Sequence, residues 1–339
     1  MKLDVAQVRA ITTGAVRVEE IDNTVHFFRF TKGQEELYKD RSNDFYMKTF
    51  ASSGICLRFH TDSQTLFFSV HTDRGSSRSY FAFDVFVNGQ KIGDLSNFSE
   101  SAMIGNYTKS KCLLGDFSKC FSLGTGEKEI CIYFPWSVRV TLKELVLDDG
   151  SCITPVKPGR KMLCFGDSIT HGYDAVYPSN KYVSKLADML DAEEYNKAIG
   201  GEIFFPDLAK AREDFEPEYI TVAYGTNDWS KCTAEELAHN CKAFFSNVSH
   251  NYPNAKIFVI TPIWRKDMNE FRPFGEFRGV EEMIQKQAAV FGNISVIHGL
   301  EFVPPKETLF ADLRLHPNDK GNAIYFENLS KHIKDILEK

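Results

Sequence analysis

Lys161-Met-Leu-Cys-Phe-Gly-Asp-Ser-Ile-Thr170 is the stretch from which the fold of this chain can be argued. Residues 162–165 form an apolar run bounded by turn residues, which is typical of a parallel strand covered on both faces. Ser168 follows, and open α/β sheets bind ligands at the carboxyl ends of such strands. If a helix begins just beyond, the Ser168 amide points out of its positive end and can receive an oxyanion. The stretch predicts a nucleophilic serine, although an ordinary strand-to-helix turn could have the same sequence pattern.

The pattern of a strand followed by a helix repeats from residue 161 to the C-terminus. The expected strands are residues 162–165, 194–196, 219–224, 256–261 and 294–298. The expected helices are residues 181–190, 205–214, 234–250, 279–291 and 320–337. Such alternation implies right-handed crossovers and a parallel sheet. We therefore predict a three-layer α/β domain over residues 161–339.

Two further stretches carry polar residues that suit chemistry at one edge of this sheet. Gly225-Thr-Asn-Asp228 follows the predicted strand 219–224, so Asn227 is expected near Ser168. Near the C-terminus, Asp312 stands four residues before His316. On one helical turn this spacing would let the carboxylate reach the far nitrogen of the imidazole.

These stretches, taken in order, resemble the SGNH (GDSL-like) hydrolases, which are serine esterases with a flavodoxin-like fold. The matching blocks are Gly166-Asp-Ser-Ile-Thr170, Asn196-Lys-Ala-Ile-Gly-Gly201, Gly225-Thr-Asn-Asp228, and Asp312 with His316-Pro-Asn318. The resemblance extends over residues 161–339, and four blocks in the family's order make it specific.

The resemblance implies a role for each matching residue. Ser168 is the expected nucleophile, His316 the general base and Asp312 the acid that orients it. The expected oxyanion donors are the Ser168 amide, the Gly201 amide and the Asn227 side chain. The family usually has two residues between acid and histidine, whereas this chain has three. If Asp312 is not the orienting group, a backbone carbonyl is the alternative, as in relatives with a Ser–His dyad.

Neighbouring residues have simpler interpretations. Asp167 is expected to anchor the turn before the nucleophile through backbone hydrogen bonds. His171 lies too close to Ser168 along a helix to aim well at a substrate carbonyl. Asn227 could instead cap the next helix, and the choice of Gly201 over Gly200 depends on aligning Asn196 with the family.

Candidate substrate-binding residues lie in loops at the strand ends. Trp229 follows the Asn227 block, and Trp264 and Arg265 follow the strand ending at residue 261. An aromatic platform beside an arginine suits a polar ring better than a long acyl chain. The alternative is that these side chains only pack the rim of the site.

Residues 1–150 have the pattern of short strands with alternating apolar positions. Clear examples are residues 57–61, 66–70 and 81–87, the last leading into the hairpin signal Asn88-Gly89. This spacing predicts an all-β sandwich or jelly-roll domain. Residues 151–160 read as a linker. Trp136 could stack on a sugar, but burial or inter-domain packing is the ordinary role of such a residue.

Composition excludes several classes of function. The net charge of −6 argues against nucleic acid or an anionic membrane as the main partner. The eight cysteines are scattered without a Cys-x-x-Cys pair, which is typical of free thiols. No cluster has metal-ligand spacing and no glycine-rich loop fits a nucleotide, so we expect no cofactor. Neither a signal peptide nor an apolar run long enough to span a bilayer is recognised, so we expect a cytoplasmic protein.

A β-sandwich followed by an SGNH domain is similar to the layout of carbohydrate esterase family two. That resemblance implies removal of O-acetyl groups from oligosaccharides of the xylan or mannan type. One rival is a lipid or thioester acylhydrolase with the same triad. Another is a carbohydrate-binding protein with a degenerate esterase domain. The sequence leaves open the sugar, the acetylated position, the role of the sandwich and whether the protein forms a homo-oligomer.

Overall fold

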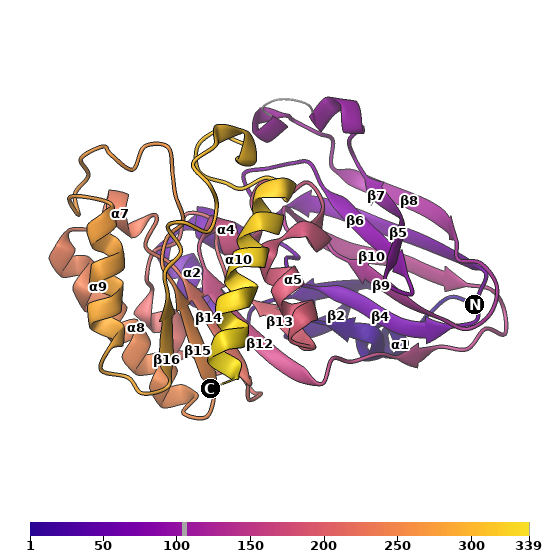
Figure 1. Cartoon of the computed structure of the whole chain (residues 1–339). Helices are drawn as coiled ribbons and strands as arrows, with labels where there is room; N and C mark the ends of the chain where they lie inside the picture. Colours follow the sequence, from indigo (N-terminus) through magenta and orange to yellow (C-terminus); the bar gives the residue numbers. More distant parts are fainter. Residues whose placement is uncertain (104–106, 339) are drawn as a thin grey trace.

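The computed structural model describes residues 1–103 and 107–338. An antiparallel β-sandwich and an α/β layer structure lie side by side, with the C-terminal helix at the α/β side (Figure 1). This architecture confirms the predicted fold class. Within the described residues, no helix is long and apolar enough to cross a membrane.

The α/β domain is built on a five-stranded sheet in which all neighbouring strands are parallel. In spatial order the strands are β13 (Ala192–Asn196), β12 (Arg160–Gly166), β14 (Tyr219–Ala223), β15 (Lys256–Ile260) and β16 (Ile294–Ile297). The chain leaves β12 for β13 on one side and then crosses to β14 on the other. The carboxyl end of β12 is therefore the switch point of the sheet, where ligands bind in such folds.

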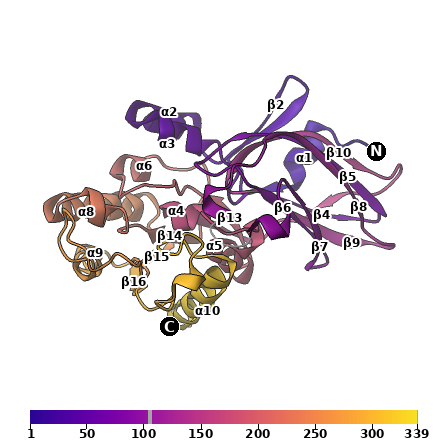
Figure 2. The same cartoon turned by 90° about the horizontal axis from the view of Figure 1, so that it is seen from above.

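Helices cover both faces of this sheet (Figure 2). One face carries α5 (Tyr182–Met189) and α10 (Asp319–Leu337), and the other carries α6 (Pro206–Lys210), α8 (Ala234–Asn251) and α9 (Arg278–Ala288). Alternate strand residues point to opposite faces, so Leu163 and Phe165 join the core under α8 while Met162 and Cys164 join the core under α5. Two short helices, α4 (Ser168–His171) and α7 (Asp228–Lys231), follow the turns at the carboxyl ends of β12 and β14.

Helix α6 ends four residues earlier than predicted, at Lys210 instead of 214. The reason is a tertiary contact, because Glu213 turns inward and pairs with Lys197 at 2.8 Å. Both side chains of this ion pair are buried. Satisfying a buried charge outweighs the modest helix propensity of this segment.

The sandwich consists of two antiparallel sheets. One contains β1 (Thr12–Thr13), β4 (Cys56–Thr61), β9 (Lys128–Tyr133), β6 (Ala82–Val87) and β7 (Gln90–Ser96), with β11 (Thr154–Pro155) beside β4. The other contains β2 (Arg17–Ile21), β3 (Thr24–Phe28), β10 (Val138–Leu147), β5 (Thr65–Arg74) and β8 (Gly115–Ser122). The predicted hairpin at Asn88-Gly89 is confirmed, with both residues at positive φ (48° and 76°) between β6 and β7. Strand β11 lies inside the predicted linker 151–160.

The N-terminal region also contains helices that the sequence pattern did not reveal. These are α1 (Val5–Ile11), α2 (Lys32–Arg41) and α3 (Asn43–Thr49), together with the 3-10 turns η1 (Glu100–Met103) and η2 (Tyr107–Lys109). A capping box of Thr31 and Gln34 begins α2, and the Ser42 side chain caps α3. Helices α2 and α3 lie beside the α/β domain in Figure 2, and Tyr38 of α2 packs into its core.

Aromatic residues fill the junction between the sandwich and the α/β domain. Tyr80, Trp136 and Tyr173 pack together in one buried cluster. Trp136 is 2% exposed and donates its indole N–H to the Ala175 carbonyl at 2.8 Å. Trp136 therefore packs between the domains and is not placed to stack on a sugar.

Candidate active site

Ser168 lies at the switch point because strand β12 ends in a tight turn. Asp167 is the N-cap of α4, and its Oδ1 accepts the Ile169 amide at 2.9 Å, which is the anchoring role predicted for it. Gly166 is required here, since a Cβ would lie 2.5 Å from Thr170 Oγ1. Burial raises the pKa of Asp167 to about 6. The turn thus presents Ser168 as the first residue of a helix.

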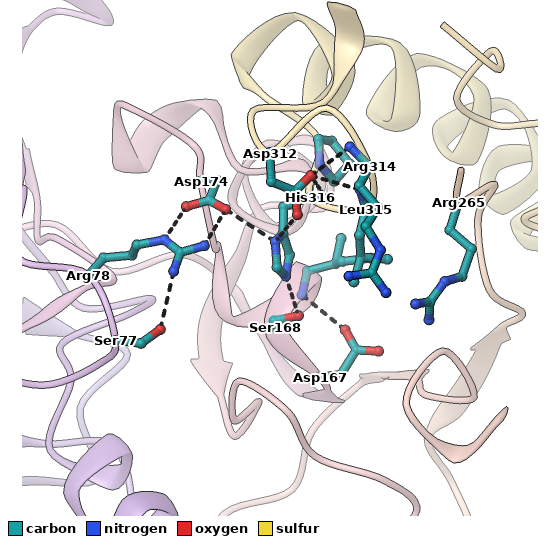
Figure 3. A network of polar contacts seen from close by, with 12 residues as sticks. Ser77, Arg78, Asp167, Ser168, Asp174, Arg265, Asp312, Arg314, Leu315 and His316 are labelled. Atoms are coloured by element: carbon teal, nitrogen blue, oxygen red, sulfur yellow. Dashed lines mark hydrogen bonds and ion pairs between the residues drawn. The ribbon is translucent and has the colours of Figure 1, made fainter. Parts of the chain in front are cut away.

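The structure brings Ser168, His316 and Asp312 together (Figure 3). His316 Nε2 lies 2.8 Å from Ser168 Oγ, and His316 Nδ1 lies 2.9 Å from Asp312 Oδ2. This is the geometry in which an imidazole removes a hydroxyl proton while a carboxylate fixes its tautomer.

The segment between Asp312 and His316 is not the helical turn that was predicted. It is an irregular loop in which Leu313 has a φ of 57°, a left-handed conformation uncommon for leucine. Asp312 Oδ1 accepts the backbone amides of Arg314, Leu315 and His316 at 2.7–3.1 Å. The loop absorbs the extra residue and still places a carboxylate, rather than a backbone carbonyl, on Nδ1.

A second carboxylate, missed from the sequence, also contacts His316. Asp174 Oδ2 lies 3.1 Å from Nδ1, on the same nitrogen as Asp312. Asp174 follows α4 with a φ of 68° and has no exposed side-chain surface. Nothing in the sequence around Asp174 distinguishes it from an ordinary loop aspartate, because its approach to His316 depends on how two distant loops fold together.

The two carboxylates control the protonation of the histidine. Burial alone lowers the pKa of His316, but the hydrogen bonds and charges of Asp174 and Asp312 outweigh it and raise the pKa to about 9. The pKa values of both aspartates are lowered, because pairing with cations and donors outweighs the desolvation that would raise them. The site therefore favours the imidazolium that forms during acyl transfer.

This shift predicts an alkaline pH profile. We expect kcat/KM for phenyl acetate to rise with pH and to level off only above about pH 9, as His316 becomes a free base. The stability of the fold should change in the opposite direction. Because the pKa of His316 is higher in the folded protein than in the unfolded chain, its protonated form stabilises the fold fully below pH 6.5, and this stabilisation is lost as the pH rises through about 9. Initial rates from pH 5 to 10, with the Ser168→Ala background subtracted, measure the first effect. A profile that levels off at pH 6.5 or below would contradict it.

Two of the predicted oxyanion donors, Gly201 and Asn227, lie on loops that contact each other. Asn227 directs its side-chain amide to the Glu202 carbonyl at 2.9 Å and makes no cap to α7, so its amide faces the loop that carries Gly201. Gly201 has a φ of 90°, in the region that favours glycine. Within the described residues, the backbone amides of Ser168 and Gly201 have no acceptor, which leaves both available for an oxyanion.

Cations that the sequence did not reveal hold the loop containing Gly201. Lys48 of α3 donates to the Gly200 carbonyl at 2.8 Å, and Lys231 of α7 donates to the Gly201 carbonyl at 2.6 Å. Arg29, buried in the domain junction, donates to the Asn196 carbonyl at 2.6 Å. Lys48 and Arg29 come from the N-terminal region, so that region fixes part of the proposed oxyanion hole.

The predicted substrate contacts are not borne out for Trp229 and Arg265. Trp229 is fully buried and donates its indole N–H to the Gly275 carbonyl at 2.8 Å. Arg265 is 3% exposed, and its Nε and Nη2 donate to the two carboxylate oxygens of Asp267 at 2.6 and 2.9 Å. Both belong to the packing of the rim, which was the alternative. Trp264 is half-buried against Phe310, and its role in substrate binding stays a prediction.

His171 is not positioned to act as the base. Its ring is fully buried, and Nε2 lies 2.9 Å from the Trp136 carbonyl, the geometry of an N–H donor. Burial lowers its pKa well below the usual value, so the ring is neutral.

The oxygen and nitrogen atoms of Asp174, Asp312 and His316 lie within 4.8 Å of one another and could hold a metal ion. Each of these groups already has partners within the protein, however. Arg78 pairs with Asp174, three backbone amides donate to Asp312 Oδ1, and His316 Nε2 contacts the Ser168 hydroxyl. The arrangement is that of a proton-transfer triad with an additional acid.

A serine, a histidine and a carboxylate at the switch point of a parallel sheet, beside unoccupied amide donors, define an α/β serine hydrolase. Residues 164–324 match the GDSL-like lipase/acylhydrolase family. This match confirms the resemblance of the α/β domain to the SGNH (GDSL-like) hydrolases. A comparison with curated proteins gave no match.

Solved structures share the whole two-domain fold. A structure named as a GDSL-like lipase from Bacteroides ovatus is 16% identical with a TM-score of 0.78, covering 100% of this chain and 98% of that one. The salicylyl-acyltransferase SsfX3 of a tetracycline biosynthetic pathway is 17% identical with a TM-score of 0.76, covering 96% and 94%. A family two carbohydrate esterase from Clostridium thermocellum, solved with cellohexaose, is 16% identical with a TM-score of 0.63, covering 85% and 94%.

Proposed function

We propose that this protein is a serine esterase that removes O-acetyl groups from carbohydrates, with xylan- or mannan-type oligosaccharides as substrates. The contact of 2.8 Å between His316 Nε2 and Ser168 Oγ, with carboxylates behind the ring, is the observation that carries the esterase chemistry. The likeness in fold to a family two carbohydrate esterase, one solved with an oligosaccharide bound, supports the sugar substrate.

The proposed reaction has two halves. Ser168 Oγ attacks the acetyl carbonyl carbon while its proton passes to His316 Nε2, and the carbonyl oxygen becomes an oxyanion held by the amides of Ser168, Gly201 and Asn227. Collapse breaks the bond to the sugar oxygen, which takes the proton from Nε2 and leaves as a free hydroxyl. Water then attacks the acetyl-serine, gives a proton to Nε2, and acetate leaves as Ser168 recovers its proton.

The surroundings of Gly201 support a small acyl group. A Cβ placed on Gly201 would lie 3.6 Å from the Phe45 ring and 3.9 Å from Lys231 Nζ, so both side chains border the proposed oxyanion hole. Arg41, Lys48 and Lys231 also lie 5.2–5.9 Å from the centre of the Phe45 ring. A narrow, cationic border of this kind suits acetyl esters of polar alcohols and opposes the rival lipid or thioester substrates, whose acyl chains need an apolar groove.

Chain-length selectivity follows from this border. We expect the wild type to prefer phenyl acetate over phenyl octanoate, and Phe45→Ala to raise the octanoate-to-acetate ratio of kcat/KM by about tenfold, because removing the ring opens space. Phe271→Ala, at a phenylalanine that is 87% exposed, should leave the ratio unchanged. A wild-type preference for octanoate would reject the deacetylase proposal in favour of the lipid acylhydrolase.

The substrate class is tested directly with acetylated xylo- and manno-oligosaccharides, comparing wild type with Ser168→Ala by mass spectrometry. Loss of acetyl mass in the wild type alone would support the proposal. Gain of acetyl mass on an added unacetylated oligosaccharide would instead indicate transfer, the activity in the name of SsfX3. If the protein bound oligosaccharides but hydrolysed neither acetylated oligosaccharides nor aryl acetates, the carbohydrate-binding alternative would be favoured.

A cytoplasmic location remains part of the proposal, with imported oligosaccharides as substrates. All eight cysteines are unpaired, five of them buried, which supports a reducing compartment. Fractionation of cells that produce the protein from its own gene would test this, and recovery outside the cytoplasm would contradict it.

A further inference from the structure

The catalytic histidine has two acids on one nitrogen, and only one belongs to the triad. Asp312 Oδ2 lies 2.9 Å and Asp174 Oδ2 3.1 Å from His316 Nδ1, and the two carboxylates approach from separate loops (Figure 3). A single N–H at Nδ1 can be shared between two such acceptors. Asp312 already uses Oδ1 for three backbone amides, so each carboxylate offers one oxygen to the ring.

The sandwich domain holds Asp174 in place. Arg78, in the loop after β5, makes a two-pronged contact, with Nε 2.7 Å from Oδ1 and Nη2 2.9 Å from Oδ2 of Asp174. The Tyr80 hydroxyl donates to Oδ1 at 3.0 Å, and the Tyr107 hydroxyl donates to the Asp174 carbonyl at 2.6 Å. Each of these donors comes from the sandwich domain, and bidentate pairing with arginine gives the carboxylate a fixed orientation.

The charges around His316 explain why the additional acid is compatible with catalysis. Two bare carboxylates would hold the imidazolium too strongly for it to return its proton. Arg78 compensates Asp174, so the two carboxylates on Nδ1 and this arginine together carry a net charge of −1, as the single acid of a simple triad does. The ring itself contacts Asp312, Asp174, Ser168 and Tyr173. Arg78 and Tyr80 of the sandwich act on it through Asp174, and Asp167 of the β12–α4 turn interacts with it electrostatically.

We infer that Asp174 is a second positioning acid for His316 and that the β-sandwich, through Arg78 and Tyr80, takes part in catalysis by fixing it. The inference rests on the proposed hydrolase function. It gives the N-terminal domain a role in the chemistry that does not depend on binding carbohydrate. It also predicts that neither acid alone is indispensable.

Asparagine variants of the two acids test the inference with phenyl acetate, a substrate that needs no sugar recognition. We expect Asp312→Asn and Asp174→Asn each to lower kcat about tenfold. The double variant should approach the about 10⁴-fold loss that follows removal of a sole triad acid. Each single change should also move the acid limb of kcat/KM down by about one pH unit, because one negative charge near the imidazolium is gone.

A matched control separates positioning from general destabilisation. Asp84→Asn removes another fully buried carboxylate in the same domain junction, where Asp84 pairs with Lys91 and accepts from the Ser179 hydroxyl at 2.6 Å. This change should lower the melting temperature without shifting the acid limb of the kcat/KM profile. If Asp174→Asn does not fold, Asp312→Asn still decides the question, because the raised pKa of His316 should persist only if Asp174 supports it.

An NMR titration of His316 in the Ser168→Ala background gives a readout that needs no activity. A His316 pKa that stays above 6.5 in Asp312→Asn and falls further in the double variant would support the inference. If Asp312→Asn alone matches the double variant, or if Asp174→Asn leaves the pKa of His316 unmoved, Asp174 is not a second acid. Absence of turnover by the wild type would instead reject the proposed function, and the titration would still report on Asp174.

Discussion

Replacing Ser168 by alanine is expected to lower kcat/KM for phenyl acetate by about 10⁴–10⁶-fold, and His316→Ala should be equally damaging. The reason is that Ser168 Oγ and His316 Nε2, 2.8 Å apart, act as one unit. Without the imidazole the hydroxyl stays protonated, and without the hydroxyl the imidazole has nothing to activate. The double variant should therefore be no slower than either single variant, which initial rates at pH 9 would measure.

The controls for this prediction come from helix α8. Ser246→Ala and His250→Ala change the same residue types at exposed positions and should retain wild-type rates. Melting temperatures of all variants show whether the loss reflects unfolding. A residual rate in His316→Ala much above that in Ser168→Ala would mean that another base, or water, activates the serine, and the triad assignment would have to be revised.

Asn227→Ala is expected to lower kcat by about 10²–10³-fold with little change in KM, since an oxyanion donor acts mainly in the transition state. The structure favours this over the capping role, because the Asn227 side chain makes no cap to α7 and instead points its amide at the loop of Gly201. The measurement is steady-state kinetics with phenyl acetate, supported by the affinity for a boronic acid that mimics the tetrahedral intermediate.

Asn240→Ala, on helix α8, is the matched control and should leave kcat unchanged. If Asn227→Ala raised KM while kcat stayed constant, Asn227 would bind the ground state, and the amides of Ser168 and Gly201 would carry the oxyanion alone. If Asn227→Ala lowered both kcat and the melting temperature but left the affinity for the boronic acid unchanged, Asn227 would have a structural role only.

The local pattern was sufficient to predict the α/β domain. An apolar run ending in Gly166-Asp-Ser168 can hardly be anything other than a buried strand with a tight turn, and its repetition with helices dictates a parallel sheet. The sandwich was predictable for the same reason, because Asn88-Gly89 and alternating apolar residues act locally. Helices α2 and α3 were missed because they are short and polar. Much of their stability comes from contacts with the α/β domain, where Tyr38 of α2 and Phe45 of α3 pack against the core and Arg41 of α2 pairs with Glu202.

By itself the sequence determined the class of the protein, its two-domain fold and the residues Ser168, Asn227 and His316, because those properties depend on local patterns and on blocks in a fixed order. Only the tertiary structure decided the rest. It buried Trp229 and Arg265, which had read as substrate contacts, and it bent the Asp312 loop around Leu313 so that the unusual spacing still serves His316. It also brought Asp174 and the sandwich to the histidine, since contacts between segments about a hundred residues apart leave no local signal.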